Sequence, residues 1–445
     1  MGIFLTAQEK NQRMPGRPGK EFLFVVIYPY KFTDFVYDLI ELGDFRRYCD
    51  VLVLDISMIT TPGFSKGISA GRSKKNEVVA LSSWSDFVRR VYDLRKRSAK
   101  TNICILNEVP YNSFPEFICN LIITAFLRRK RVAVLDLYNG GVPLRYPEDA
   151  LTLNEIAPKS SFYARTLRFI KNTSTPLEAW KKSLSVLFGF LARFMPSATT
   201  HRLVAGKDWL KLAEQNKPAS NQIRLIFGHS HDYSNNLLHK LKSPAFFLPQ
   251  KKTAVLLDSA GPMYGSDSVH TGRRVCFTTN VWYPALTRWF DWIEAETDVR
   301  VVIAGHYKST HPAIAPCFGN RPVHYGKTRE LVWNSEFVIT RASTAISYAV
   351  MFKKPVMFIY SNQLKEDRLA MRDIRGMAAM LGNEPVNIDE PPIDIGGLLK
   401  VDEVRYRNYE KACLTSSGSQ RPNVQIILED IMGINPGSQF MKASI

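Results

Sequence analysis

The chain has 445 residues, which is long enough for two domains, each with its own core. It is 45% hydrophobic and 22% charged, a composition that excludes a disordered or fibrous protein. Lysine and arginine number 59 against 41 acidic residues, so the formal net charge is +18. A chain this basic favours polyanionic partners: nucleic acid, an anionic membrane surface or a phosphate-bearing substrate.

The six cysteines are scattered without a CxxC pair, which argues against a zinc knuckle or a disulfide framework and favours a reduced, cytoplasmic compartment. The amino-terminal residues lack the apolar segment of a secretory signal, although Gly2 and Thr6 match a short myristoylation pattern that often occurs by chance. The longest apolar stretch, residues 117–127, is too short to span a bilayer. The protein is therefore expected to be cytoplasmic, either soluble or peripheral on the inner face of the cell membrane.

Short apolar runs alternate with amphipathic segments from residue 21 to residue 141. Strands are expected at FLFVVIYP, CDVLVLDIS, VVALS, NICILNEVP and RVAVLDLYNGG, and helices at FTDFVYDLIELGDF, SDFVRRVYDLRKRS and SFPEFICNLIITAFLRRK. Continuous apolar strands that alternate with helices indicate a parallel sheet covered on both faces. This part of the chain is predicted to be a doubly wound α/β domain.

Residues 147–209 differ in composition and are predicted to form a basic, amphipathic, helical insert. Its densest part is TPLEAWKKSLSVLFGFLARFMP. Such a helix suits an anionic membrane surface, but it also suits an ordinary helix that faces the core with solvated lysines, the more ordinary of the two interpretations. The apolar face consists of Leu184, Val186, Leu187, Phe190, Leu191 and Phe194, beside Lys181, Lys182 and Arg193.

A second α/β series begins near residue 251, after the strand, loop and helix start expected in IRLIFGHSHDYSNNLL. Strands are expected at KKTAVLLD, VRVVIAG, FVIT and KPVMFIY, with helices between them. The predicted division is a first α/β domain over residues 1–245, a second over 246–385, and a tail over 386–445 that packs back on the domains. Two doubly wound, Rossmann-like domains face each other across a cleft at the carboxyl ends of their strands.

Two common nucleotide-binding patterns are missing from the sequence. No GxGxxG follows a predicted strand, which argues against a nicotinamide enzyme, and no complete Walker A motif occurs. Gly326-Lys327-Thr328 looks like the tail of a Walker A motif, but the upstream glycine and the preceding strand are missing. No helix-turn-helix or RNA-binding motif stands out, and the aromatic residues lie mostly in apolar runs.

Two adjacent hydroxyls, Ser343 and Thr344, stand where the strand FVIT passes into a helix. A helix amino terminus offers free N–H groups and the positive end of the helix dipole, so hydroxyls there can cap the helix or join the N–H groups around a phosphate. One hydroxyl suffices for a cap. The pair, with Arg341 before it and a predicted cleft in front of it, favours phosphate binding.

The span from residue 254 to residue 362 resembles the carboxyl-terminal half of GT-B-type glycosyltransferases of bacterial surface-polysaccharide assembly. The resemblance rests on LLDSAGP, on WYPALTRWFDWIEAETDVRVVIAGH and above all on GKTRELVWNSEFVITRASTAISYAVMFKKPV. Lipopolysaccharide and capsule biosynthesis proteins of this kind have a strand that ends in His-Pro. A later strand in these proteins leads into a Ser-Thr or Ser-Ser pair, a helix and Lys-Pro-Val. The resemblance covers about a quarter of the chain and implies a GT-B fold and a nucleotide-sugar donor. It also implies that residues 1–245 form the acceptor-side domain and residues 246–385 the nucleotide-sugar-binding domain.

Carried over by position, the resemblance implies that Ser343 and Thr344 hold the donor phosphate. His306 falls at the histidine of the His-Pro pair but is followed by Tyr307, whereas a true pair occurs at His311-Pro312, so both histidines stay candidates for the phosphate and nucleotide. Each is equally compatible with an ordinary surface loop. Other candidates are Lys327 and Arg341 as charge partners of the phosphate, and Glu330 as a ribose ligand or a plain helix-surface residue.

Sugar transfer needs a base for the acceptor hydroxyl and neutralisation of the leaving nucleotide. Asp258, at the end of a predicted strand, and Asp232, in the sequence HSHDY, are the candidate catalytic bases, and each is also placed to cap a helix. His229, His231 and Asp232 also suggest metal ligands, but no further ligands lie nearby in sequence. No DxD occurs in the setting that metal-dependent transferases use, so we expect neither metal nor cofactor.

The predicted function is that of a metal-independent glycosyltransferase. It would move a sugar from a CMP- or UDP-linked donor to a glycan or lipid-linked acceptor. The basic charge would then hold the enzyme on an anionic membrane, through residues 128–131 and the helix that carries Lys181 and Lys182. Three alternatives stay open: a polyol-phosphate transferase or nucleotide-sugar epimerase of the same fold, a non-catalytic scaffold, and a basic nucleic-acid-binding protein.

Overall fold

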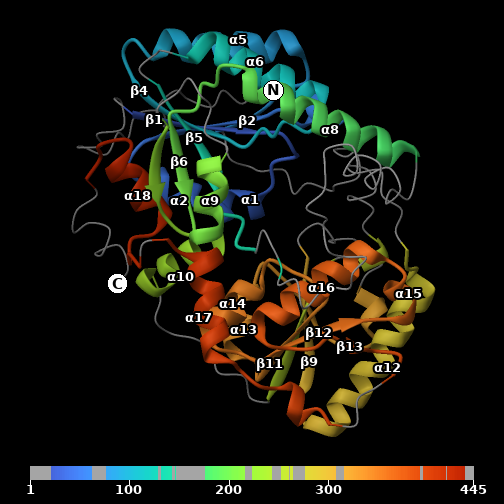
Figure 1. The fold of residues 1–445 in the computed structure, drawn as a ribbon. Coiled ribbons are helices and arrows are strands. Elements are labelled where there is room, and N and C mark those ends of the chain that lie inside the picture. Colours follow the sequence, from blue (N-terminus) through green and yellow to red (C-terminus); the bar gives the residue numbers. More distant parts are fainter. Residues whose placement is uncertain are drawn as a thin grey trace, which may run out of the picture.

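The fold was obtained as a computed structural model (Figure 1). The structure describes residues 22–62, 77–128, 132–142, 146, 176–215, 223–242, 252–259, 261–263, 276–306, 315–390, 394–416 and 418–435. Within these ranges the chain forms two parallel sheets.

The first sheet has the strand order β3-β2-β1-β4-β5-β6-β7, and every adjacent pair is parallel. Its strands are β1 (Phe22–Tyr28), β2 (Asp50–Asp55), β3 (Val78–Ala80), β4 (Asn102–Asn107), β5 (Val132–Tyr138), β6 (His201–Val204) and β7 (Arg224–Phe227). The order reverses between β1 and β4, as in a Rossmann domain.

The apolar run of β1 shows why this sheet is covered on both faces. Phe24 and Val26 belong to the hydrophobic core on one face, whereas Leu23, Val25 and Ile27 belong to the core on the other. Since successive strand residues point to opposite faces, a continuous apolar strand must be buried twice. The helices over the Phe24 face are α1 (Asp34–Leu39), α2 (Leu42–Phe45), α10 (His231–Lys242) and α18 (Asn423–Asp430), and those over the other face are α3 (Ser57–Thr60), α5 (Trp84–Arg97) and α6 (Phe114–Leu127).

The second sheet repeats the same topology, with parallel strands in the order β10-β9-β8-β11-β12-β13. Its strands are β8 (Thr253–Leu257), β9 (Arg300–Gly305), β10 (Val323–Tyr325), β11 (Phe337–Thr340), β12 (Val356–Tyr360) and β13 (Val386–Asn387). Its longer helices are α12 (Thr279–Thr297), α13 (Thr328–Asn334), α14 (Ile346–Phe352), α16 (Arg368–Leu381) and α17 (Glu403–Tyr409), and the short α15 spans Asn362–Lys365. Two doubly wound sheets, each in Rossmann order, confirm the predicted fold class.

The described part of the region predicted as a helical insert, residues 176–209, contains a helix, a strand and the start of a second helix. α8 (Pro176–Phe194) is the expected amphipathic helix, but β6 lies between β5 and β7 in the sheet, and α9 (Lys207–Gln215) follows it. The interpretation of α8 as a core-facing helix is wrong for most of its apolar face, because all of that face except Leu184 is exposed. Among the described residues, no helix has both the length and the apolar character needed to cross a membrane.

The last part of the chain returns from the second unit to the first. After α17, a π-helical segment (Glu410–Leu414) leads to a β-bridge between Thr415 and His229. α18 then buries Val424, Ile427 and Leu428 in the same core as Phe24. This crossing brings the tail against the turn between β7 and α10, which is where the candidate site begins.

Candidate functional site

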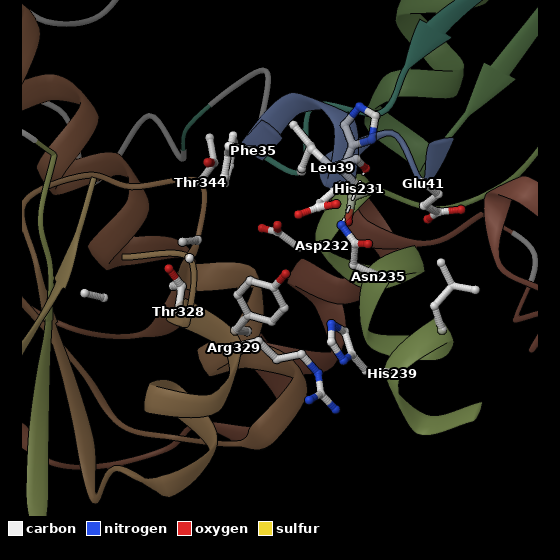
Figure 2. Close-up of a pocket in the computed structure, with 18 of the residues that line it drawn as sticks. Phe35, Leu39, Glu41, His231, Asp232, Asn235, His239, Thr328, Arg329 and Thr344 are labelled. Carbon is white, nitrogen blue, oxygen red and sulfur yellow. Dashed lines mark hydrogen bonds between the residues drawn. The ribbon is translucent and has the colours of Figure 1, made fainter. Parts of the chain in front are cut away.

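A cavity of about 1030 Å³ lies between the two units, at the carboxyl ends of both sheets (Figure 2). The second unit lines it with the residues that follow β8, β9, β10 and β11. The first unit lines it with α1, α2, the residues after β5, and one face of α10. Parallel α/β sheets bind ligands at this edge, because loops from several strands converge there.

The Ser343–Thr344 pair lies on the wall of this cavity, between β11 and α14. The backbone N–H of Ala345 donates to Ser343 Oγ at 3.3 Å, so Ser343 closes the turn that starts the helix. Thr344 is exposed, and Figure 2 shows it on the cavity wall formed by the second unit. One hydroxyl of the pair thus supports the turn, and the other faces the space where a ligand would lie.

His306 and Asp258 line the same wall. His306 follows the end of β9 directly, and Asp258 follows β8. The N–H of Asp258 donates to the Ala304 carbonyl at 3.1 Å, which keeps the two strand ends together. Burial, and then the charge of Asp258, raises the pKa of Tyr325, another lining residue. The carboxylate of Asp258 is therefore close enough to influence the groups around it.

Asp232 lines the opposite wall, in the first turn of α10. Its carboxylate accepts hydrogen bonds from Ser347 Oγ and from the Tyr348 hydroxyl, both on α14 of the second unit. Burial raises the pKa of Asp232 to about 6, and the two hydrogen bonds offset part of that rise. Asp232 is therefore ionised at neutral pH and has a pKa close to that expected of a general base.

Next to Asp232, a row of polar side chains spaced four residues apart begins at His231 and extends along α10. His231, Asn235 and His239 share one face of the helix, and Figure 2 shows all three at the cavity. Burial lowers the pKa of His231 to about 4, and a hydrogen bond with the backbone of Leu39 opposes this, so His231 is neutral at physiological pH. Asn235 Nδ2 donates to the Leu39 carbonyl at 3.5 Å.

The turn before α10 is held by the carboxyl-terminal tail. His229 is fully buried, with Nδ1 2.9 Å from Thr415 Oγ1 and Nε2 3.0 Å from the carbonyl oxygen of Arg421. Its backbone N–H donates to Asn423 Oδ1 at 3.0 Å. Both ring nitrogens of His229 are therefore used in the architecture, which removes it from the HSHDY set of metal ligands. Within the described ranges, no group of three or more His, Cys, Asp and Glu side chains could hold a metal ion.

The charged candidates are divided between the cavity and its surroundings. Glu330 lines the cavity, next to Arg329, whose Nη1 is 3.8 Å from Glu330 Oε1. Lys327 and Arg341 are not among the lining residues of the described chain. The Arg341 guanidinium donates to Ser259 Oγ and lies over the ring of Phe277, with 4.7 Å to the ring centroid. His311 lies outside the described residues.

Several lining residues were missed from the sequence because they are contributed by distant segments. Arg329 is buried and donates through Nε to Asn236 Oδ1 at 3.1 Å, across the two units. The Tyr348 hydroxyl likewise donates a hydrogen bond across the two units, to the Asp232 carboxylate. The four-residue spacing along α10 was a visible signal. No sequence signal pointed to the acidic side chains on and between α1 and α2 that also line the cavity: Asp34, Asp38, Glu41 and Asp44.

No protein-family model matches the sequence, and no curated protein matches it either. Structures similar to the chain include UDP-GlcNAc 2-epimerase from Methanocaldococcus jannaschii, with 9% identity, a TM-score of 0.43, and coverage of 91% of this chain and 98% of that one. They also include MurG of Acinetobacter baumannii, with 9% identity, a TM-score of 0.38, and coverage of 93% and 100%. A third is the wall teichoic acid polymerase TagF, with 11% identity, a TM-score of 0.42, and coverage of 95% and 87%.

The class of fold follows from the strand pairings themselves. Two Rossmann-type sheets face each other across a cleft that both units line. This is the GT-B fold, and it confirms the fold that the resemblance predicted.

Proposed function

We propose that the chain is a metal-independent glycosyltransferase that binds a nucleotide sugar in the cavity between its two units. The observation that carries the proposal is the convergence of Ser343, Thr344 and His306 on one wall with Asp232 on the other. The first wall offers hydroxyls and an imidazole to a phosphate, and the second offers a carboxylate to a hydroxyl group. A nucleotide sugar has its phosphate next to its reacting carbon and suits both walls at once.

In the proposed reaction, the acceptor oxygen attacks the anomeric carbon of the donor and forms the new C–O bond. Asp232 accepts the proton of that hydroxyl group, and Asp258 is the second candidate for this role. The bond between the anomeric carbon and the phosphate oxygen breaks, and the nucleotide leaves with the electron pair. Thr344, Ser343 and His306 stabilise the charge that develops on the phosphate.

The acceptor would lie against the first unit, over residues 1–245 of the proposed domain division. The exposed carboxyl groups of Asp34 and Asp38, on α1, line that part of the cavity, and carboxylate oxygens accept hydrogen bonds. They therefore suit the many hydroxyl groups of a glycan, whether free or linked to a lipid. A polyol-phosphate acceptor would place like charges beside them.

The first test is a thermal-shift screen against CMP, UDP, GDP, CDP and their sugar conjugates. A nucleotide that binds the folded protein well above its Kd is expected to raise Tm by roughly 5 °C. The shift should be lost in Ser343→Ala/Thr344→Ala and kept in Ser82→Ala/Ser183→Ala, which removes two exposed hydroxyls outside the cavity. No shift with any nucleotide would refute the donor site and favour a scaffold protein or, with a salt-sensitive gel shift, a nucleic-acid-binding protein.

A second test separates the transferase from the other reactions that such a site serves. Radiolabelled sugar that enters a larger product supports sugar transfer. Label that remains in an isomerised nucleotide sugar would identify an epimerase, and transfer of a labelled polyol phosphate would identify the other alternative. Asp232→Asn should reduce kcat far more than it changes nucleotide binding, since the side chain faces the acceptor in the proposed site.

A further inference from the structure

Among the described residues, α8 packs on the first unit through a narrow strip of its surface. Phe188 is buried, with its ring centroid 5.2 Å from that of Phe117 and 6.0 Å from that of Phe114, both on α6. Beside it, Ser185 Oγ donates to Asn112 Oδ1 at 3.2 Å. These contacts orient the helix about its own axis and leave the opposite side facing outward.

The outward side of α8 is apolar over about half of the circumference, at 100° per residue. Trp180 is 63% exposed and Phe194 is 73% exposed, and the rings of Phe190 and Phe194 contact each other, with their centroids 5.0 Å apart. The large apolar side chains exposed on this helix are Leu177, Trp180, Val186, Leu187, Phe190, Leu191 and Phe194. A contiguous apolar face of this kind on a protein surface marks a contact site.

Basic residues accompany this apolar face. α8 contains Lys181, Lys182 and Arg193 against a single acidic residue, Glu178. The neighbouring α5, which packs on α6, ends in three exposed basic residues, at positions 95–97. Figure 1 shows α5, α6 and α8 together in the upper part of the view, with the second sheet at the bottom. The apolar helix α8 and the end of α5 on the same unit therefore both carry an excess of basic residues.

We infer that α8 is a docking helix for an anionic lipid bilayer and lies in the plane of the interface. Trp, Phe and Leu on one side with lysine alongside is the composition that interfacial helices use. A second copy of this chain is the less suitable partner, because two chains that each carry a net charge of +18 repel each other, whereas an anionic surface attracts them. The surface lies outside the cavity, so lipid binding does not depend on the proposed donor site.

The test is co-sedimentation of the full chain with vesicles of equimolar phosphatidylglycerol and phosphatidylcholine, compared with vesicles of phosphatidylcholine alone. Wild-type protein should bind the anionic vesicles at least about tenfold more tightly, and high salt should weaken the binding. Phe190→Ser/Phe194→Ser should lose about tenfold or more of that affinity. The matched control is Phe227→Ser/Val404→Ser, two apolar side chains that are 48% and 57% exposed on other elements. It should bind like the wild type.

Lys181→Gln/Lys182→Gln should weaken binding to anionic vesicles and leave the weak binding to phosphatidylcholine unchanged. An equal loss in the control variant, or equal binding to both kinds of vesicle, would overturn the proposal. So would a wild-type protein that ignores vesicles but is a dimer by light scattering, and whose Phe190→Ser/Phe194→Ser variant is a monomer. Tm and the nucleotide-induced shift should be the same in all four proteins, because the substituted side chains are exposed or only partly buried and lie outside the cavity.

Discussion

Replacing Asp232 by Asn is expected to remove a strong pH dependence of stability. Burial raises the pKa of Asp232 from its ordinary value of 3.8 to about 6 in the folded protein. The folded state therefore holds the proton more tightly than the unfolded state, so the carboxyl group favours folding most below about pH 4, and this contribution is lost as the pH rises through about 6. A difference of about two pH units corresponds to about 3 kcal/mol, at roughly 1.4 kcal/mol for each.

The measurement is urea unfolding of wild type and Asp232→Asn between about pH 4 and pH 7, with the difference in unfolding free energy taken at each pH. Asparagine does not titrate, so the wild type should lose about 3 kcal/mol relative to the variant over this range. Ser347→Ala removes one hydrogen bond that lowers the pKa, so in that variant the loss should move to higher pH. A difference that stays flat with pH would show that Asp232 is not a buried, shifted carboxylate.

Two further predictions concern the tail and the turns that it contacts. Gly206→Ala should lower the unfolding free energy by about 3 kcal/mol or more, because φ is +80° and a Cβ would lie 2.3 Å from the Ala412 carbonyl oxygen. Gly433→Ala, at φ +69° with nothing within 4 Å, should cost only about 1–2 kcal/mol, and equal costs in urea unfolding would contradict the close contact. Tyr409→Phe should cost about 1–2 kcal/mol by the same assay, since its buried hydroxyl donates to the Gly141 carbonyl at 3.0 Å, and no loss would contradict that bond.

The strands were predictable where a continuous apolar run is buried on both faces. β1 and β11 are of this kind, and every residue of β11 is buried. β6 was missed because it is only four residues long and begins with His201 and Arg202. The Arg202 side chain is buried all the same, and its Nη1 donates to the Ala213 carbonyl at 2.7 Å. A local apolar pattern cannot reveal a strand whose polar side chain finds its partner on the next helix.

The lining residues of the candidate site were predictable only where they lie close to the end of a strand. Ser343, Thr344 and His306 were found because each lies within four residues of the end of an apolar strand, and the carboxyl ends of parallel strands meet at one edge. The role of His229 was not predictable, since its partners Thr415 and Arg421 are almost two hundred residues away. Sequence spacing had made it a candidate metal ligand, and the structure makes it the link between the tail and α10.

The contact between α10 and α14 joins the two halves of the proposed chemistry. Both hydroxyls that bond Asp232 come from α14, the helix that begins just after Ser343 and Thr344. If α14 moved away from α10, the carboxylate would lose two hydrogen bonds that stabilise its charged form and would gain water instead. The protonation of the candidate base is therefore tied to the position of the helix that would meet the donor phosphate. A base assembled in this way is set to its working pKa only when the two units are together.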